Sequence, residues 1–200
     1  MAEVKGGWGR VVWMPTFEAE HYVRRSNQPN RPFVSVARNG ELRLEVKEVI
    51  GVIAKTRTRE SNGQLVLATG HSSADEALML VREARRQGVE HIVLTHPLLE
   101  IIGMSIAQMQ EAAKLGAFVE FVSNFARGPE AAARTREYAD AIRKVGVRSS
   151  IVSSDLGQMG NPPHPDGLAA AAQALRRQGF TDQELDLLFK ENPARLLGLR

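Results

Sequence analysis

The hydrophobic positions of the chain alternate between short continuous runs and longer stretches with helical spacing. From Gln64 onward this rhythm is regular, with apolar runs at 65–68, 91–94, 117–122 and 149–153 and helical patterns at 74–87, 105–115 and 129–144. Ser73 and Glu76 have the spacing of a capping box at the start of the first of these helices. Strand–helix units of about 25 to 30 residues predict parallel strands joined by right-handed crossovers.

The first third of the chain is less regular. An apolar run at 10–14 predicts a buried strand that ends at Pro15, and Asn39-Gly40 predicts a two-residue hairpin turn between 32–37 and 41–44. The remaining predicted helices cover 46–55, 166–178 and 182–190, with a last turn at 193–196. We expect one domain over 1–200, because the chain has 200 residues and no evident linker.

Three polar residues occupy equivalent places in their strand–helix units. His71, His96 and Asp155 each follow the carboxyl end of a predicted parallel strand. Catalytic and binding residues collect at that edge in barrels and in open α/β sheets. Two imidazoles and one carboxylate suit a divalent metal such as zinc, manganese or iron. The alternative for each histidine is a structural role in which the ring is satisfied by hydrogen bonds.

Two further residues are candidates for substrate contact. Glu120 lies within the predicted strand 117–122, where a carboxylate is costly unless it is paired or binds a metal. It points into the site, or it pairs with an arginine or faces a solvated barrel end. His21 follows the first strand after the short polar loop Phe17 to Glu20. This loop lies at the right edge for substrate contact but also fits plain surface structure, so His21 is either a substrate contact or plain surface. His91 begins its strand, so we interpret it as structural. His164 lies between two prolines beyond Asp155 and either is a turn residue, the favoured interpretation, or approaches the site.

Composition narrows the class of protein. The chain has no cysteine, which excludes disulfides and thiolate metal ligands. Its net charge is +3 and its basic residues are scattered, so we expect no nucleic-acid partner. It lacks a signal peptide core and any apolar run of the roughly 20 residues that span a bilayer. We therefore expect a cytoplasmic protein that acts on a small molecule and does not enter membranes.

Several short motifs resemble one known family. Thr69-Gly70-His71, Val93 to Pro97 and Ser154 to Gln158 resemble the fifth, sixth and eighth strand ends of the amidohydrolase superfamily. The tail Glu191 to Leu199 resembles its closing N-P-A-x-L-L-G-L element, and Val11 to Thr16 resembles the fourth strand in an uncharacterised branch of predicted metal-dependent hydrolases. The resemblance implies an α/β fold, a partial or distorted TIM-type barrel whose strands correspond to strands four to eight.

The resemblance also implies roles for particular residues. His71 and His96 would be metal ligands, Asp155 both a ligand and the general base, and Gln158 a substrate contact. The first three strands of the barrel, with their H-x-H metal-binding pair, are missing from this sequence. The chain is therefore truncated, completed by another chain, or degenerate. A partial barrel exposes strand edges, so we expect a homo-oligomer.

Two functions follow as expectations, and the sequence does not decide whether the protein is an enzyme. The first is a metal-dependent hydrolase that cleaves a C–N or C–O bond of a small molecule by metal-activated water, with zinc the first choice of metal. The second is a non-catalytic barrel that acts as a binding or structural protein. A third alternative, an unrelated open α/β binding module, is less favoured, because the ordered strand-end motifs would then be a coincidence.

Overall fold

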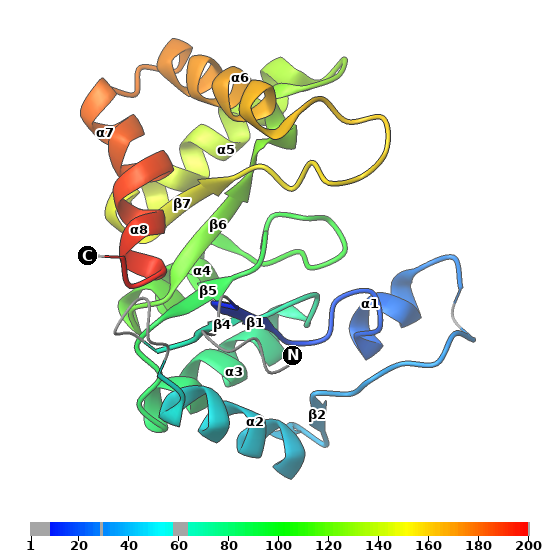
Figure 1. Ribbon diagram of the computed structural model, residues 1–200. Helices are drawn as coiled ribbons and strands as arrows, with labels where there is room; N and C mark the ends of the chain where they lie inside the picture. The colour runs from blue at the N-terminus through cyan, green and yellow to red at the C-terminus, as the bar shows by residue number, and fades with distance from the viewer. Residues whose placement is uncertain (1–8, 29, 58–63, 200) are drawn as a thin grey trace.

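A computed structural model describes residues 9–28, 30–57 and 64–199 of the chain (Figure 1). Its main sheet is parallel throughout and has the order β1-β4-β5-β6-β7. The sheet strands are β1 (Val11–Trp13), β4 (Val66–Ala68), β5 (Ile92–Leu94), β6 (Phe118–Val122) and β7 (Ser150–Ser153). This is the α/β architecture of a partial TIM-type barrel, as the sequence predicted.

Helices follow the strands in the order expected for right-handed crossover units. The helices of the first half are α1 (Glu20–Arg25), α2 (Leu44–Lys55), α3 (Ala74–Arg86) and α4 (Ile106–Lys114). The helices of the second half are α5 (Ala131–Val145), α6 (His164–Arg177), α7 (Asp182–Asp186) and α8 (Asn192–Leu196), with the π-helical segment Leu187–Glu191 between the last two. Short 3-10 turns cover Ser123–Ala126 and Val147–Ser149.

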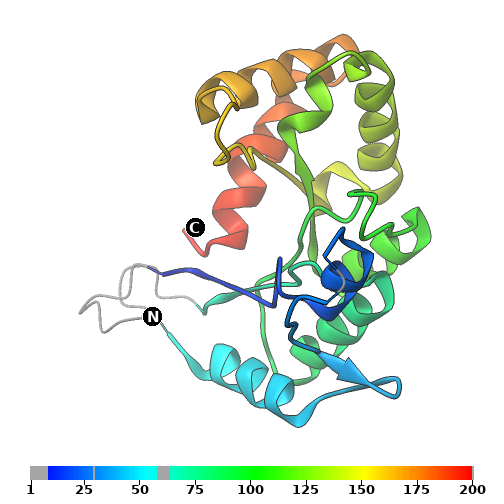
Figure 2. The ribbon, with the colours of Figure 1, turned by 90° about the vertical axis from the view of Figure 1, so that its right-hand side faces the viewer.

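β4 and β5 are buried on both faces, which is why they are apolar without alternation, whereas β1 is only partly buried, although the sequence predicted a buried strand there. One face meets α3, α4 and α5, while α8 lies against the other (Figures 1 and 2). Successive residues divide between the two sides: Leu67 and Leu94 belong to the large core under the helices, and Val66 and Val93 pack with Leu196 of α8.

The tail of the chain is fixed to the sheet by one buried side chain. Asn192, the first residue of α8, donates two hydrogen bonds from its amide nitrogen, to the carbonyl oxygens of Val147 (2.8 Å) and Ser150 (2.7 Å). The side chain is fully buried. An amide is suited to this place because it offers two donors from one nitrogen, so the asparagine of the N-P-A element has a structural task here.

Most predicted elements are confirmed. Ser73 and Glu76 form the predicted capping box of α3, and Asn39-Gly40 turns the two-stranded hairpin of β2 (Ala37–Arg38) and β3 (Glu41–Leu42). Helix α1 was not predicted, and α6 begins at His164 rather than at Asp166. His164 therefore opens a helix instead of a turn. Proline is compatible with the first turn of a helix, where the amide it lacks would be unpaired.

The described part of the sheet ends at β1. Among the described strands, β1 pairs only with β4, so its outer edge has no partner strand. Exposed apolar side chains lie on and near this edge and on α2, namely Trp13, Phe33, Val34, Leu44, Val49 and Val52. Within the described residues, no helix has the length and hydrophobicity needed to cross a membrane.

Candidate functional site

The end of β4 brings His71 to the carboxyl edge of the sheet. Gly70 has a left-handed backbone (φ +62°), and a Cβ there would lie 2.3 Å from the carbonyl oxygen of Met14. The close approach of the two chains thus requires glycine. Beyond it, the His71 amide donates a hydrogen bond to the carbonyl oxygen of Pro15 (3.0 Å). The continuation of β1 therefore fixes where the His71 side chain begins.

The end of β5 is tied to that of β4 by two threonines. The Thr95 hydroxyl accepts a hydrogen bond from the Gly70 amide, and the Thr69 hydroxyl accepts one from the Thr95 amide, each at 3.0 Å. The next residue, His96, has a φ of +25°, which is uncommon for any residue but glycine. Strained backbone of this kind concentrates at functional sites.

The end of β7 carries Asp155 on a second left-handed backbone (φ +49°). Its neighbours hold the strand end in place. The Ser123 hydroxyl donates to the carbonyl oxygen of Ser154 (2.9 Å), and Leu156 is buried against Gly167, where a Cβ would lie 2.1 Å from the leucine Cδ1. Asp155 itself is exposed at the sheet edge.

Glu120 of β6 links the two neighbouring strand ends. Its Oε2 accepts a hydrogen bond from the backbone amide of His96 (3.1 Å), and its Oε1 accepts one from the Ser153 hydroxyl (2.8 Å). The carboxylate is thus paired, as its place in a strand demands, but with an amide and a hydroxyl rather than with an arginine. It fixes the backbone of His96 relative to β7.

These side chains line one pocket of about 600 Å³. It collects five of the six residues predicted for the site: His71, His96, Glu120, Asp155 and Gln158. The sixth, His21, is not among its lining residues. His21 lies on α1, where its Nε2 is 2.7 Å from the carbonyl oxygen of Ile101, so its contact with substrate stays a prediction.

Burial and neighbouring charges shift the pKa values of two of these groups. Desolvation, reinforced by His96, lowers the pKa of His71 to about 4, against weaker opposing effects that include Asp155. The His71 imidazole is therefore neutral at pH 7, the form that binds metals. Burial raises the pKa of Glu120, and the hydrogen bond from Ser153 opposes that shift.

The imidazole and carboxylate groups of this pocket are of the types that bind divalent cations. Both imidazoles have a buried Nδ1 with no hydrogen-bond partner, although buried polar atoms are nearly always paired. Imidazole and carboxylate ligands are those of zinc, manganese and iron sites. However, across residues 9–28, 30–57 and 64–199, no three histidine, aspartate or glutamate side chains are grouped closely enough to hold an ion as they stand.

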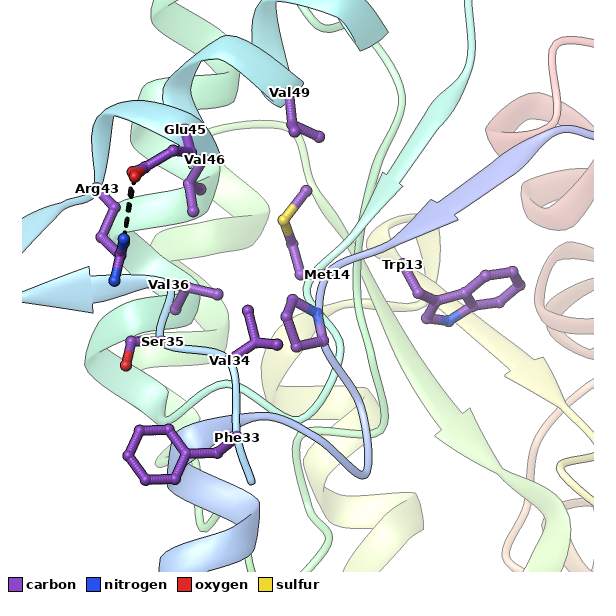
Figure 3. A pocket seen from close by; sticks show the side chains of 11 residues that line it. Trp13, Met14, Phe33, Val34, Ser35, Val36, Arg43, Glu45, Val46 and Val49 are labelled. Atoms are coloured by element: carbon purple, nitrogen blue, oxygen red, sulfur yellow. Dashed lines mark hydrogen bonds and ion pairs between the residues drawn. The ribbon is translucent and has the colours of Figure 1, made fainter. Parts of the chain in front are cut away.

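A second pocket, of about 540 Å³, lies between β1, the segment 33–36 and the start of α2 (Figure 3). Its walls are apolar, with Met14, Val34 and Val49 among them, and an ion pair between Arg43 and Glu45 (3.0 Å) lies at one side. No histidine lines it, so it is not the site predicted from the strand ends.

Sequence reasoning placed the loop Phe17 to Glu20 at the edge of the site, but it did not single out the other side chains around this pocket. Phe17 and Tyr22 lie around His71: the Tyr22 ring stacks on it (centroids 4.9 Å apart, 29° between planes) and Phe17 meets it edge to face (5.2 Å). The available signal was two aromatic residues just after the first strand. The further lining residues that were missed are Trp13, Thr16, Thr95, Leu99, Ser153 and Ser154.

Comparison with known proteins gives a family and a fold. Residues 1–120 match the model of a family of unknown function, DUF6282, and the chain belongs to that family. A comparison with curated proteins gave no match.

Among solved structures, the chain is similar to the Escherichia coli phosphotriesterase homology protein, which was crystallised with phosphate in its active site. The two chains share 16% sequence identity, and their TM-score is 0.61. The match covers 90% of this chain but 64% of that one, so this chain spans somewhat less than two thirds of the neighbour's length. At this identity the likeness establishes the fold.

Proposed function

We propose that this pocket is the site of a metal-dependent hydrolase of the amidohydrolase type, which cleaves a C–N or C–O bond of a small molecule. The observation that carries the proposal is the convergence of His71, His96 and Asp155 in one pocket at the carboxyl edge of a parallel sheet. The left-handed backbones of His96 and Asp155 support it, since such strain persists where function requires it.

The side chains have complementary tasks in this proposal. His71 and His96 would hold a divalent ion, zinc in the first instance, through nitrogens that lack other partners. The chemistry that such an ion supplies is a fall in the pKa of water towards about 7. Asp155 would be a ligand and would accept the proton of the attacking water. Glu120 would keep His96 in place through its amide.

Metal binding is tested by measuring the metal content of the purified protein and of the variants His71→Ala and His96→Ala. We expect nearly one equivalent of zinc, manganese or iron in the wild type and a loss of most of it in each variant. The matched control is His91→Ala, because His91 precedes β5 at the opposite edge of the sheet. An unchanged metal content in the two site variants would refute the assignment of the ligands.

The role of Asp155 is tested by kinetics on a panel of small amides and esters. Loss of a general base typically lowers the rate by about 10² to 10⁴, and we expect Asp155→Asn to lower kcat within this range. Asp166→Asn, an exposed change in the first turn of α6, is the control. An Asp155→Asn protein that retains full kcat would contradict the proposed role.

The second candidate is a binding or structural protein that keeps the fold without catalysis. It is favoured by the lack of an assembled group of three ligands among the described residues. A protein that binds no metal in the presence of excess zinc, manganese or iron would establish this candidate over the first.

A further inference from the structure

The aromatic and apolar side chains that line the pocket indicate which substrates it accepts. This evidence is separate from the chemistry proposed for His71, His96 and Asp155. Trp13, Phe17 and Tyr22 come from β1 and the segment that follows it, and Leu99 comes from the loop after β5. Two of these side chains are half exposed, Trp13 at 54% and Phe17 at 50%. A ligand with an apolar surface would bury them, and removal of apolar area from water is favourable by about 25 cal/mol per Å².

The rings form a continuous series that leads to the candidate catalytic residues. Phe17 meets Tyr22 edge to face, with ring centroids 5.3 Å apart and planes at 88°. Tyr22 stacks on His71, whose ring centroid is 5.0 Å from that of His96. Aromatic rings pair best in stacked and edge-to-face arrangements of this kind. Within this series it is the half-exposed ring of Phe17 that offers surface to a flat group in the pocket.

Without a bound ion, the charges of the described lining residues disfavour anions. None of the described residues that line the pocket is a lysine or an arginine, whereas two of them, Glu120 and Asp155, are acidic. Sites that recognise carboxylate or phosphate groups commonly use guanidinium or ammonium groups. Arg127 connects to the lining only through an intermediate: it donates to the Asn161 side chain (2.8 Å), which in turn donates to Gln158 (2.8 Å).

We propose that the pocket takes an uncharged substrate in which a flat apolar or aromatic group adjoins the amide or ester to be cleaved. The reaction type in this statement rests on the proposed function. The preference for a neutral, flat group rests on the ring series and on the lack of basic residues among the described lining, and it is a property of these side chains in the absence of a bound ion.

The test compares ligands of the same shape and different charge: benzamide, benzoate and phenyl phosphate, with acetamide as the compound that lacks a ring. The chain has two tryptophans, so a Trp8→Phe variant leaves Trp13 of the pocket as the single indole reporter. Binding is followed by its fluorescence in buffer with EDTA. Excluding metal ions keeps the ranking of ligands separate from the question of whether the chain binds a metal.

We expect benzamide to bind at least ten-fold more tightly than benzoate, phenyl phosphate or acetamide. Adding Phe17→Ala should weaken benzamide binding at least five-fold, while adding Val52→Ala, on the exposed face of α2, should leave it unchanged. Ligand-observed magnetic resonance on the same variants checks that the optical signal reports binding. Equal or tighter binding of benzoate or phenyl phosphate, no detectable binding of benzamide, or no effect of Phe17→Ala would overturn the proposal.

Discussion

The carboxylate of Glu120 accepts a hydrogen bond from the backbone amide of His96 (3.1 Å), so a side chain of β6 holds the left-handed turn that ends β5. Its second oxygen accepts the Ser153 hydroxyl. Removing the carboxylate leaves two polar groups without their partner, and each costs about 1–3 kcal/mol if it stays buried. We expect Glu120→Ala to lower the free energy of unfolding by about 2–4 kcal/mol.

Urea unfolding measures this effect, and Glu120→Gln is the matched variant. Glutamine can keep both contacts, because its oxygen can accept from the His96 amide and its NH2 group can donate to the Ser153 hydroxyl, so Glu120→Gln should lose much less stability than Glu120→Ala. Equal stability of Glu120→Ala and the wild type would show that the two hydrogen bonds are replaced by water.

The lowered pKa of His71 makes stability depend on pH. Unfolded histidine titrates near 6.5 and folded His71 near 4, so the unfolded state binds more protons between these values. The contribution of His71 is therefore fully present above pH 6.5 and is lost as the pH falls to about 4. Its size is on the order of 3 kcal/mol.

We expect metal-free wild-type protein to lose more stability between pH 7 and pH 4.5 than His71→Gln does. Urea unfolding at both pH values in the presence of EDTA measures the difference. Glu120, whose raised pKa acts in the opposite direction, is present in both proteins. A parallel fall in wild type and His71→Gln would contradict the burial of a neutral His71.

Gly70 is the position where the packing of β1 against β4 tolerates no side chain. A Cβ would lie 2.3 Å from the Met14 oxygen and 2.4 Å from the Pro15 oxygen, both of them backbone atoms. We expect Gly70→Ala to destabilise the fold by about 2–4 kcal/mol, through overpacking together with the left-handed backbone.

Gly40→Ala separates the cost of overpacking from the cost of the left-handed backbone. Gly40 is also left-handed (φ +79°), but a Cβ there meets nothing within 4 Å. Its substitution should therefore show the backbone penalty alone, about 1–2 kcal/mol. Thermal unfolding of both variants gives the comparison, and equal losses would mean that the backbone near Met14 yields to the extra carbon.

We propose that a second copy of the chain covers the open β1 edge and the apolar surface beside it. Unpaired strand edges and exposed apolar patches promote association. Val34→Lys and Val49→Glu, two half-exposed positions of the pocket in Figure 3, should then shift the protein towards a monomer in light scattering at tens of micromolar. Met159→Glu is the control, since Met159 is fully exposed beyond β7, at the other end of the sheet. A wild-type monomer would exclude this association.

The sequence predicted the strand–helix order because the apolar runs and the Ser73 capping box indicate the same boundaries. It missed α1, which has six residues and no side-chain cap at Ala19, so no local signal marks its start. For the site, the position of histidines at strand ends predicted which of them share a pocket. The contact of Tyr22 with His71 depends on how the segment after β1 folds back, which no spacing encodes.

The backbones of His96 and Asp155 lie in a region that glycine adopts freely and other residues adopt at a cost of about 1–3 kcal/mol. Glycine would relieve this strain, but it would also remove the imidazole and the carboxylate from the pocket. Under selection for thermal tolerance alone, both positions should therefore change to glycine. Under selection for activity, His96 and Asp155 should be retained despite their cost. Sequencing the survivors of the two selections would show whether these residues are kept for the fold or for their chemistry.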